Sequence, residues 1–163
     1  LDEHPAHWLL AYIMWPGLAR DLVLVRQPEP PRGPVVVFDA PDGWKVTPSP
    51  SGLELKKGRL VGGISVFDKS TFKRCQSQLG QRSSIQPPDY QATVEVSEVR
   101  FGECFGKKCL YLMTAPERWK QVDYMLQVPG GYVGVFLSTR TGTGFNESPF
   151  EAKLHTLRLS TPD

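Results

Sequence analysis

Residues 122–138 read VDYMLQVPGGYVGVFLS, and this stretch decides the fold. From Val122 to Val128, apolar side chains occupy every second position, which is the period of a β-strand. Pro129-Gly130-Gly131 follows as a tight turn, and Tyr132 to Ser138 supply the returning strand. The stretch therefore predicts an antiparallel hairpin, and the alternation in its first strand predicts that one face of that strand is wet.

The neighbouring residues extend this hairpin into a larger sheet and a closing helix. Thr93 to Arg100 and Cys109 to Thr114 predict two further strands. Ser148-Pro149-Phe150-Glu151 predicts a helix start, with a serine cap, a proline at the first helical position and a glutamate that completes a capping box. The buried stripe of this helix is expected to be Phe150, Leu154 and Leu157.

The first half of the domain predicts shorter elements. Val35 to Phe38 predicts a strand that runs into a Pro41-Asp42-Gly43 turn, after which Trp44 restarts a strand. Residues 53–67 predict a hairpin through Lys57-Gly58. Asp68 or Ser70 is then expected to cap a short helix that buries Phe72, Cys75 and Leu79 and stops at Gly80.

The composition is that of one globular domain. The chain has 163 residues, 40% of them hydrophobic, and its fifteen glycines and fifteen prolines favour short elements joined by turns. Its net charge of +2 is too small to predict a nucleic-acid surface. No apolar run reaches the roughly 18 residues of a membrane span, so no transmembrane segment is expected. The predicted class is α+β, mainly an antiparallel β-sheet with flanking helices.

Residues 1–33 are expected to form an N-terminal helical segment and a Pro-rich connector, ahead of a single α/β binding domain at 34–163. Four prolines between Gln27 and Pro34 favour an extended, stiff connector. Before it, Trp8, Tyr12 and Trp15 recur at the spacing of one helix face. This stripe either packs across the sheet or is an exposed anchor for a partner groove or a membrane interface.

The order of elements resembles a family of small α/β/α domains that includes the photosystem oxygen-evolving subunit P, the Ran-binding protein Mog1 and the bacterial DcrB-like proteins. The resemblance is carried by Phe38-Asp39-Ala40-Pro41-Asp42-Gly43-Trp44, by the strand Gly106 to Tyr111 and by Phe150 to Leu159 as the final helix. It covers about residues 34–161. It implies an α/β/α sandwich of the Mog1/PsbP-like kind and a binding module without catalysis.

The three cysteines bear on the compartment. Cys104 and Cys109 flank a turn-like tetrapeptide, so a disulfide across the ends of a hairpin is expected, with Cys75 reduced and buried. One bridge and one buried thiol favour an oxidising compartment, and we therefore expect the periplasm; three free thiols would favour the cytoplasm. Any signal peptide would have preceded Leu1.

No constellation of catalytic residues stands out. The histidines are His4, His7 and His155, and the first two have no third ligand at a matching spacing, so no metal site is predicted. Without a base, neither Cys104 nor a serine is an activated nucleophile, and the glycine-rich turns lack a phosphate-loop continuation. We therefore expect no enzymatic activity and no cofactor.

These exclusions favour a non-enzymatic protein-binding domain. The specific hypothesis is a bacterial immunity protein that neutralises a secreted antibacterial toxin, encoded next to it, by direct binding. The alternatives are a DcrB-like chaperone for secretion effectors, an extrinsic subunit of a photosynthetic complex, or an enzyme whose site is not evident. Arg118 and Trp119 are the expected hot spot, unless Trp119 only closes the core. The stripe of Trp8, Tyr12 and Trp15 is the second candidate surface, and the polar connections expected to bind are 81–90, 115–119 and 139–147.

Overall fold

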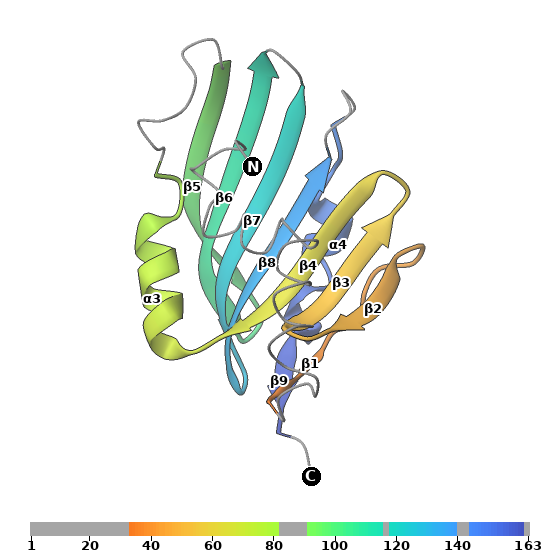
Figure 1. The fold of residues 1–163 in the computed structure, drawn as a ribbon, viewed down its shortest axis with the longest axis vertical. Coiled ribbons are helices and arrows are strands. Elements are labelled where there is room, and N and C mark those ends of the chain that lie inside the picture. Colours follow the sequence, from red (N-terminus) through yellow and green to blue (C-terminus); the bar gives the residue numbers. More distant parts are fainter. Residues whose placement is uncertain (1–32, 82–90, 116–117, 140–143, 162–163) are drawn as a thin grey trace, which may run out of the picture.

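The computed structural model describes residues 33–81, 91–115, 118–139 and 144–161 (Figure 1). Its elements are, in chain order, β1 (Val35–Val37), β2 (Lys45–Ser49), β3 (Gly52–Lys57), β4 (Leu60–Phe67), α3 (Lys69–Gln78), β5 (Gln91–Phe101), β6 (Cys104–Ala115), β7 (Trp119–Val128), β8 (Gly131–Thr139), α4 (Ser148–Glu151), the 3₁₀ helix η2 (Leu154–Thr156) and β9 (Arg158–Ser160). None of the described helices is long and apolar enough to cross a membrane.

One large antiparallel sheet dominates the described part of the chain. Its strand order is β2-β3-β4-β8-β7-β6-β5, and each neighbouring pair runs antiparallel. β1 and β9 form a separate antiparallel pair, in which Val36 lies opposite Leu159. The predicted α+β class with a mainly antiparallel sheet is therefore confirmed.

The hairpin predicted from residues 122–138 lies near the middle of this sheet. β7 and β8 pair from Lys120 opposite Thr139 to Val128 opposite Gly131. Gly130 adopts a φ of +94° in the turn, a conformation that favours glycine because it has no Cβ. The Pro-Asp-Gly turn uses the same property, since Gly43 has a φ of +88°.

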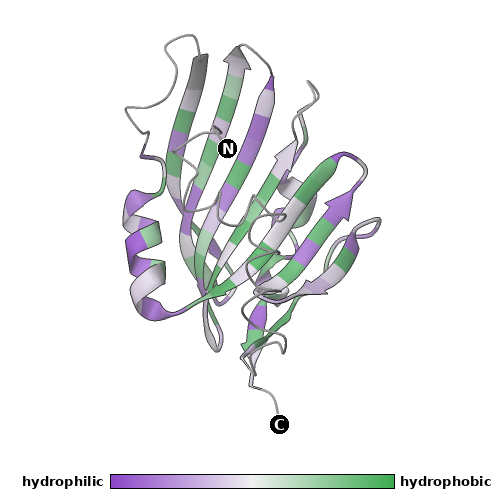
Figure 2. Cartoon of the chain, viewed as in Figure 1, coloured by the Kyte–Doolittle hydropathy of each residue, from purple (hydrophilic) through white to green (hydrophobic). Residues whose placement is uncertain are grey.

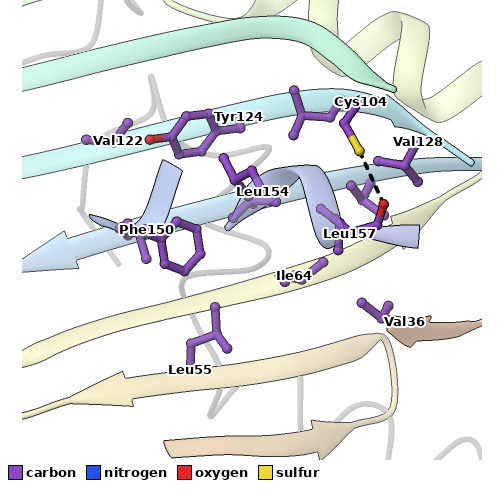
Figure 3. Packing of buried hydrophobic residues seen from close by; sticks show 14 of the residues in the cluster. Val36, Leu55, Ile64, Cys104, Val122, Tyr124, Val128, Phe150, Leu154 and Leu157 are labelled. Atoms are coloured by element: carbon purple, nitrogen blue, oxygen red, sulfur yellow. Dashed lines mark hydrogen bonds between the residues drawn. The ribbon is translucent and has the colours of Figure 1, made fainter. Parts of the chain in front are cut away.

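The larger hydrophobic core lies on the face of the sheet that α4 and η2 cover, which we call the C-terminal face. Phe150, Leu154 and Leu157 pack there with Tyr124 and the other inward residues of the central strands (Figure 3). The Sγ of Cys104 donates a hydrogen bond to the carbonyl of Leu157 at 3.2 Å. The three residues predicted as a buried stripe are thus all in the core.

The opposite face, which we call the helix face, carries α3. The Oδ1 of Asp68 accepts a hydrogen bond from the backbone N–H of Thr71 at 2.7 Å, which confirms Asp68 as the cap of this helix. Phe72 and Cys75 are buried against Met125 of β7. The single helix predicted between the two halves of the sheet therefore packs on one face of its central strands.

The predicted solvent-exposed face of β7 is wrong for most of the strand, because both faces are buried from Gln121 to Leu126 and only Gln127 is exposed. Tyr124 and Leu126 lie in the core of the C-terminal face, while Asp123 and Met125 on the helix face are just as inaccessible. Figure 2 shows the strands of the sheet banded in hydrophilic and hydrophobic colours. Alternation predicts the faces of a strand, but whether the polar face is wet depends on what packs over it.

The closing helix is also different from its prediction, which ran from Phe150 to Leu159. α4 is a single turn that begins after Glu147, no side-chain cap forms, and the Ser148 backbone N–H donates to the Asn146 side chain at 3.0 Å. The chain then enters β9, where the N–H of Leu159 donates to the carbonyl of Pro129 at 2.8 Å. Pairing with β1, about 120 residues earlier in the chain, replaces the later turns of the helix.

Candidate functional site

The antiparallel topology brings the predicted binding connections to one end of the sheet. β6 ends at Ala115 opposite Gln91, the first residue of β5, and β8 ends at Thr139 opposite Lys120, near the start of β7. We call this end the loop end (Figure 1). The connections that begin or finish there are 81–90, 115–119 and 139–147, of which residues 82–90, 116–117 and 140–143 lie outside the described residues.

Arg118 and Trp119, the predicted hot spot, have opposite environments. Arg118 is exposed at the loop end. Trp119 is only 8% exposed, packs with Tyr111 and Met113, and donates its Nε1–H to the Oγ of Ser138 at 2.9 Å. The structure thus fits the alternative in which Trp119 closes a small core beneath the loop end, and a role of this residue in binding stays a prediction.

An ion-pair network fixes the end of connection 139–147, together with α4, to the C-terminal face. The Nζ of Lys108 lies 3.1 Å from Glu147 and 2.7 Å from Glu151, and the Nζ of Lys120 lies 2.9 Å from Glu147. Tyr124 donates its hydroxyl to Glu151 at 2.6 Å. These contacts join two neighbouring strands to α4, so the loop end has a rigid base.

The network is largely withdrawn from solvent. Burial works to raise the pKa of Glu147, but the hydrogen bonds and charges of Lys120 and Lys108 outweigh it and lower that pKa to about 2. The side chains of Lys120 and Lys108 are only 16% and 19% exposed, so these cations belong to a largely buried network and not to a solvated face. A signal for Lys120 was present, since it occupies the same strand face as Val122 and Tyr124.

A second group of polar side chains lies on the helix face. Gln121, Asp123 and Ser138 are fully or almost fully buried, and we call these three residues the polar row. Gln121 lies opposite Ser138, and its Nε2 donates to the Oδ1 of Asp123 at 2.7 Å. Within the described residues, the Oε1 of Gln121 and the Oδ2 of Asp123 have no hydrogen-bond partner. The sequence does not distinguish this row from an ordinary solvated strand face.

Asp123 is a buried carboxyl without a cationic neighbour across the strands. Its cross-strand neighbours are Cys109 and Phe136. Burial raises the pKa of Asp123 well above its ordinary value, although the hydrogen bond from Gln121 opposes this shift. The group is therefore protonated and neutral below that raised pKa. A side chain that is inaccessible to solvent cannot contact a free substrate as a base. The carboxyl instead restricts which neighbouring groups can pack against it, because they have to match its hydrogen-bonding needs.

The predicted Cys104–Cys109 disulfide is wrong, because both residues, like Cys75, are free thiols. The tetrapeptide between them is strand rather than turn, and the turn lies earlier, at Gly102-Glu103. Five residues apart on one strand, the two thiols are on opposite faces and separated by about 17 Å, well beyond disulfide reach. Burial raises the pKa of the Cys104 thiol, which keeps it protonated and unreactive.

The remaining predicted residues give no further site among those that the structure describes. Trp8, Tyr12 and Trp15 lie outside the described residues. Within the described ranges, no group of three or more His, Cys, Asp or Glu side chains is arranged to hold a metal ion.

The comparisons with known proteins supply no relative from which a role can be transferred. No protein-family model matches the chain, and no curated protein matches it at a significant level. The loop end and the polar row are therefore the features from which function has to be argued.

Proposed function

We propose that this chain is a non-enzymatic protein-binding domain whose partner surface is the loop end of the sheet. The specific form of the proposal is a bacterial immunity protein that binds and neutralises a secreted antibacterial toxin encoded next to it. The observation that carries the proposal is the gathering of three polar connections at one end of the sheet, since binding residues concentrate on loops that a scaffold positions.

The charges at the loop end support a partner with an acidic surface. Lys57 and Arg59 flank the turn between β3 and β4, which opens at the same end, and both are exposed. Arg118 adds a third exposed cation at the start of β7. Exposed charges of one sign steer a partner of the opposite sign and raise its association rate.

The alternatives receive less support from the described residues. A chaperone for secretion effectors needs a continuous apolar cradle. The large apolar side chains that are exposed are dispersed over both faces and the small β1–β9 pair: Val35, Val46, Val61, Val96, Phe105 and Leu112. An extrinsic photosynthetic subunit is distinguished from an immunity protein by the genes that surround it.

Membership of the Mog1/PsbP-like family is likewise a proposal. It is supported by helical segments on both faces of an antiparallel sheet and by the turn that precedes β2. The short α4 departs from the family's final helix. The free thiols remove the cysteine argument for the periplasm, so the proposal does not depend on an oxidising compartment.

The test is a binding and rescue experiment with the product of the adjacent gene. Co-expression of this chain is expected to restore growth of cells that express that product, and the purified pair is expected to form a complex. Arg118→Glu together with Arg59→Glu should weaken the complex at least tenfold, whereas Arg158→Glu, an exposed arginine on β9 away from the loop end, should not. Failure of the unaltered chain to bind or to rescue would refute the immunity proposal.

A further inference from the structure

We propose that β5 pairs with the β5 of a second copy of this chain, so that two seven-stranded sheets join edge to edge. The two strands run antiparallel around a twofold axis that passes beside Val96. This interface lies along one edge of the sheet rather than at the loop end (Figure 1). The proposal therefore does not depend on the partner proposed for the loop end, and the two are tested separately.

The two edges of the sheet differ in their protection against pairing with another chain. β2 and β5 are the outermost strands, so each has a neighbour in the sheet on one side only. β2 has five residues, begins with Lys45 and contains Pro48, which has no N–H to donate. Short length, lysine and proline are features that keep an edge strand from adding a further strand. The β2 edge is therefore protected.

β5 has none of these features. It has eleven residues, Gln91–Phe101, without proline, lysine or glycine. The irregularity in its register lies between Gln91 and Ala92, so the rest of the strand follows β6 without a break. A long, regular and unprotected edge strand is a site at which another strand can add through backbone hydrogen bonds.

The turn between β5 and β6 determines which backbone groups of β5 face outward. The two strands are joined by the two-residue turn Gly102-Glu103, and Phe101 lies opposite Cys104 across it. The residues that close such a turn exchange backbone hydrogen bonds, and every second residue along the strand does the same. The odd-numbered residues of β5 therefore bond to β6, whereas the even-numbered residues from 94 to 100 direct their N–H and C=O groups outward.

The middle of this edge is accessible and partly apolar. The side chain of Val96 is 45% exposed, although Gly80 lies against it on the helix face. All residues from Glu95 to Glu98 are exposed. A second strand can therefore approach the outward backbone groups at the centre of β5 and bury an exposed valine.

Symmetry restricts the register of a pair of identical strands. Opposite residues of antiparallel strands point to the same face, so the twofold axis passes beside a residue that lies opposite itself. With the axis at Val96, all eleven residues pair and the exposed valine packs against its own copy. Glu98 then lies opposite Val94, and Glu95 lies opposite Ser97, so no like charges meet. An axis at Glu98 would oppose two carboxylates, and an axis at Ser97 would place Val96 opposite Glu98. This self-complementarity identifies a second copy as the occupant.

Sedimentation equilibrium of the full chain tests the proposal. We expect a reversible dimer of twice the 18.2 kDa chain mass. Val96→Lys should raise the Kd of this dimer about tenfold or more, because two ammonium groups would meet at the axis. The control is Val46→Lys, an exposed valine on the protected strand β2, which should leave the Kd unchanged. A monomer at all concentrations up to about 1 mM, or equal effects of the two substitutions, would overturn the proposal.

Cysteine cross-linking tests the register and needs no destabilised variant. In the proposed dimer, Glu95 and Ser97 of the two copies form a pair without mutual backbone hydrogen bonds, with Cα atoms about 4.5 Å apart and within disulfide reach. The Glu95→Cys and Ser97→Cys chains are mixed and oxidised mildly, while the three native thiols are buried. Cross-linked dimer should form several times faster in the mixture than in either variant alone, because identical positions lie diagonally, about 7–8 Å apart. No cross-link in the mixture, or fastest cross-linking of Ser97→Cys alone, would contradict pairing around Val96.

Discussion

Replacing Asp123 with Asn tests the physical state of the polar row directly. Asn has nearly the same shape, and its Oδ1 can keep the hydrogen bond that the Nε2 of Gln121 donates at 2.7 Å. The substitution therefore removes the titratable proton while it preserves most of the packing. What changes is the dependence of stability on pH.

The sign follows from the raised pKa of Asp123. Above about pH 4 the unfolded chain has released this proton while the folded chain still holds it, so folding takes up a proton. The free energy of unfolding of the wild type then falls by about 1.4 kcal/mol for each pH unit, until the pH passes the folded pKa. The Asn variant lacks this contribution, so its stability relative to wild type should rise by the same amount per pH unit, up to the raised pKa of the folded carboxyl.

Urea denaturation at pH 4.5, 5.5, 6.5 and 7 measures this difference. All other groups are common to the two proteins, so their contributions cancel in the comparison. Glu95→Gln removes the same charge from an exposed strand position and measures the effect of net charge alone. If the stabilities of Asp123→Asn and wild type run parallel across this range, the carboxyl is solvated or paired in the folded state, and the reasoning about the polar row is refuted.

Three further predictions concern the scaffold. Glu147→Gln should lower the free energy of unfolding by about 1–3 kcal/mol at pH 7, as measured by urea denaturation. Because the folded pKa of Glu147 is lowered to about 2, this difference from wild type should shrink as the pH falls from about 4.5 to 2. Gly106→Ala should lower the free energy of unfolding by about 1–3 kcal/mol in the same assay, because the added Cβ would collide with the carbonyl of Met125. The control is Gly144→Ala, which should cost less than about 0.5 kcal/mol because nothing lies within 4 Å of its Cβ. Equal effects of the two substitutions would contradict the close approach of Gly106 to Met125. Protein unfolded without reductant should show three alkylatable thiols by mass spectrometry, and two fewer would restore the disulfide.

Local sequence patterns were sufficient for most strands and turns. The hairpin at 122–138 and the helix that Asp68 caps depend on residues that are close together in the chain, namely a two-residue period, a glycine with positive φ and a side chain that bonds to a nearby N–H. Arg118 is exposed, and its role as a binding residue stays a prediction.

The predictions that were wrong share one cause, which is that contacts between distant parts of the chain outweigh local sequence signals. The capping signal at Ser148 is a local preference of about 1 kcal/mol, and pairing of β9 with β1 together with burial of Leu157 and Leu159 outweighs it. The predicted Cys104–Cys109 disulfide is wrong because one strand continues through the tetrapeptide between the two cysteines. The glycine and two lysines of this tetrapeptide resemble a turn in the sequence.

The sequence by itself therefore determined the strands, their turns and the mainly antiparallel class, because these follow from spacing and backbone preferences within a few residues. Only the tertiary structure decided which polar residues are buried. Lys108 and Glu147 are distant in the chain and become a pair because β6 and the segment before α4 meet on one face. Asp123 is fully buried, although its neighbours in the sequence do not distinguish it from an acid on a solvent-exposed strand face. Burial is a property of what packs across a sheet, and this depends on residues far apart in the chain.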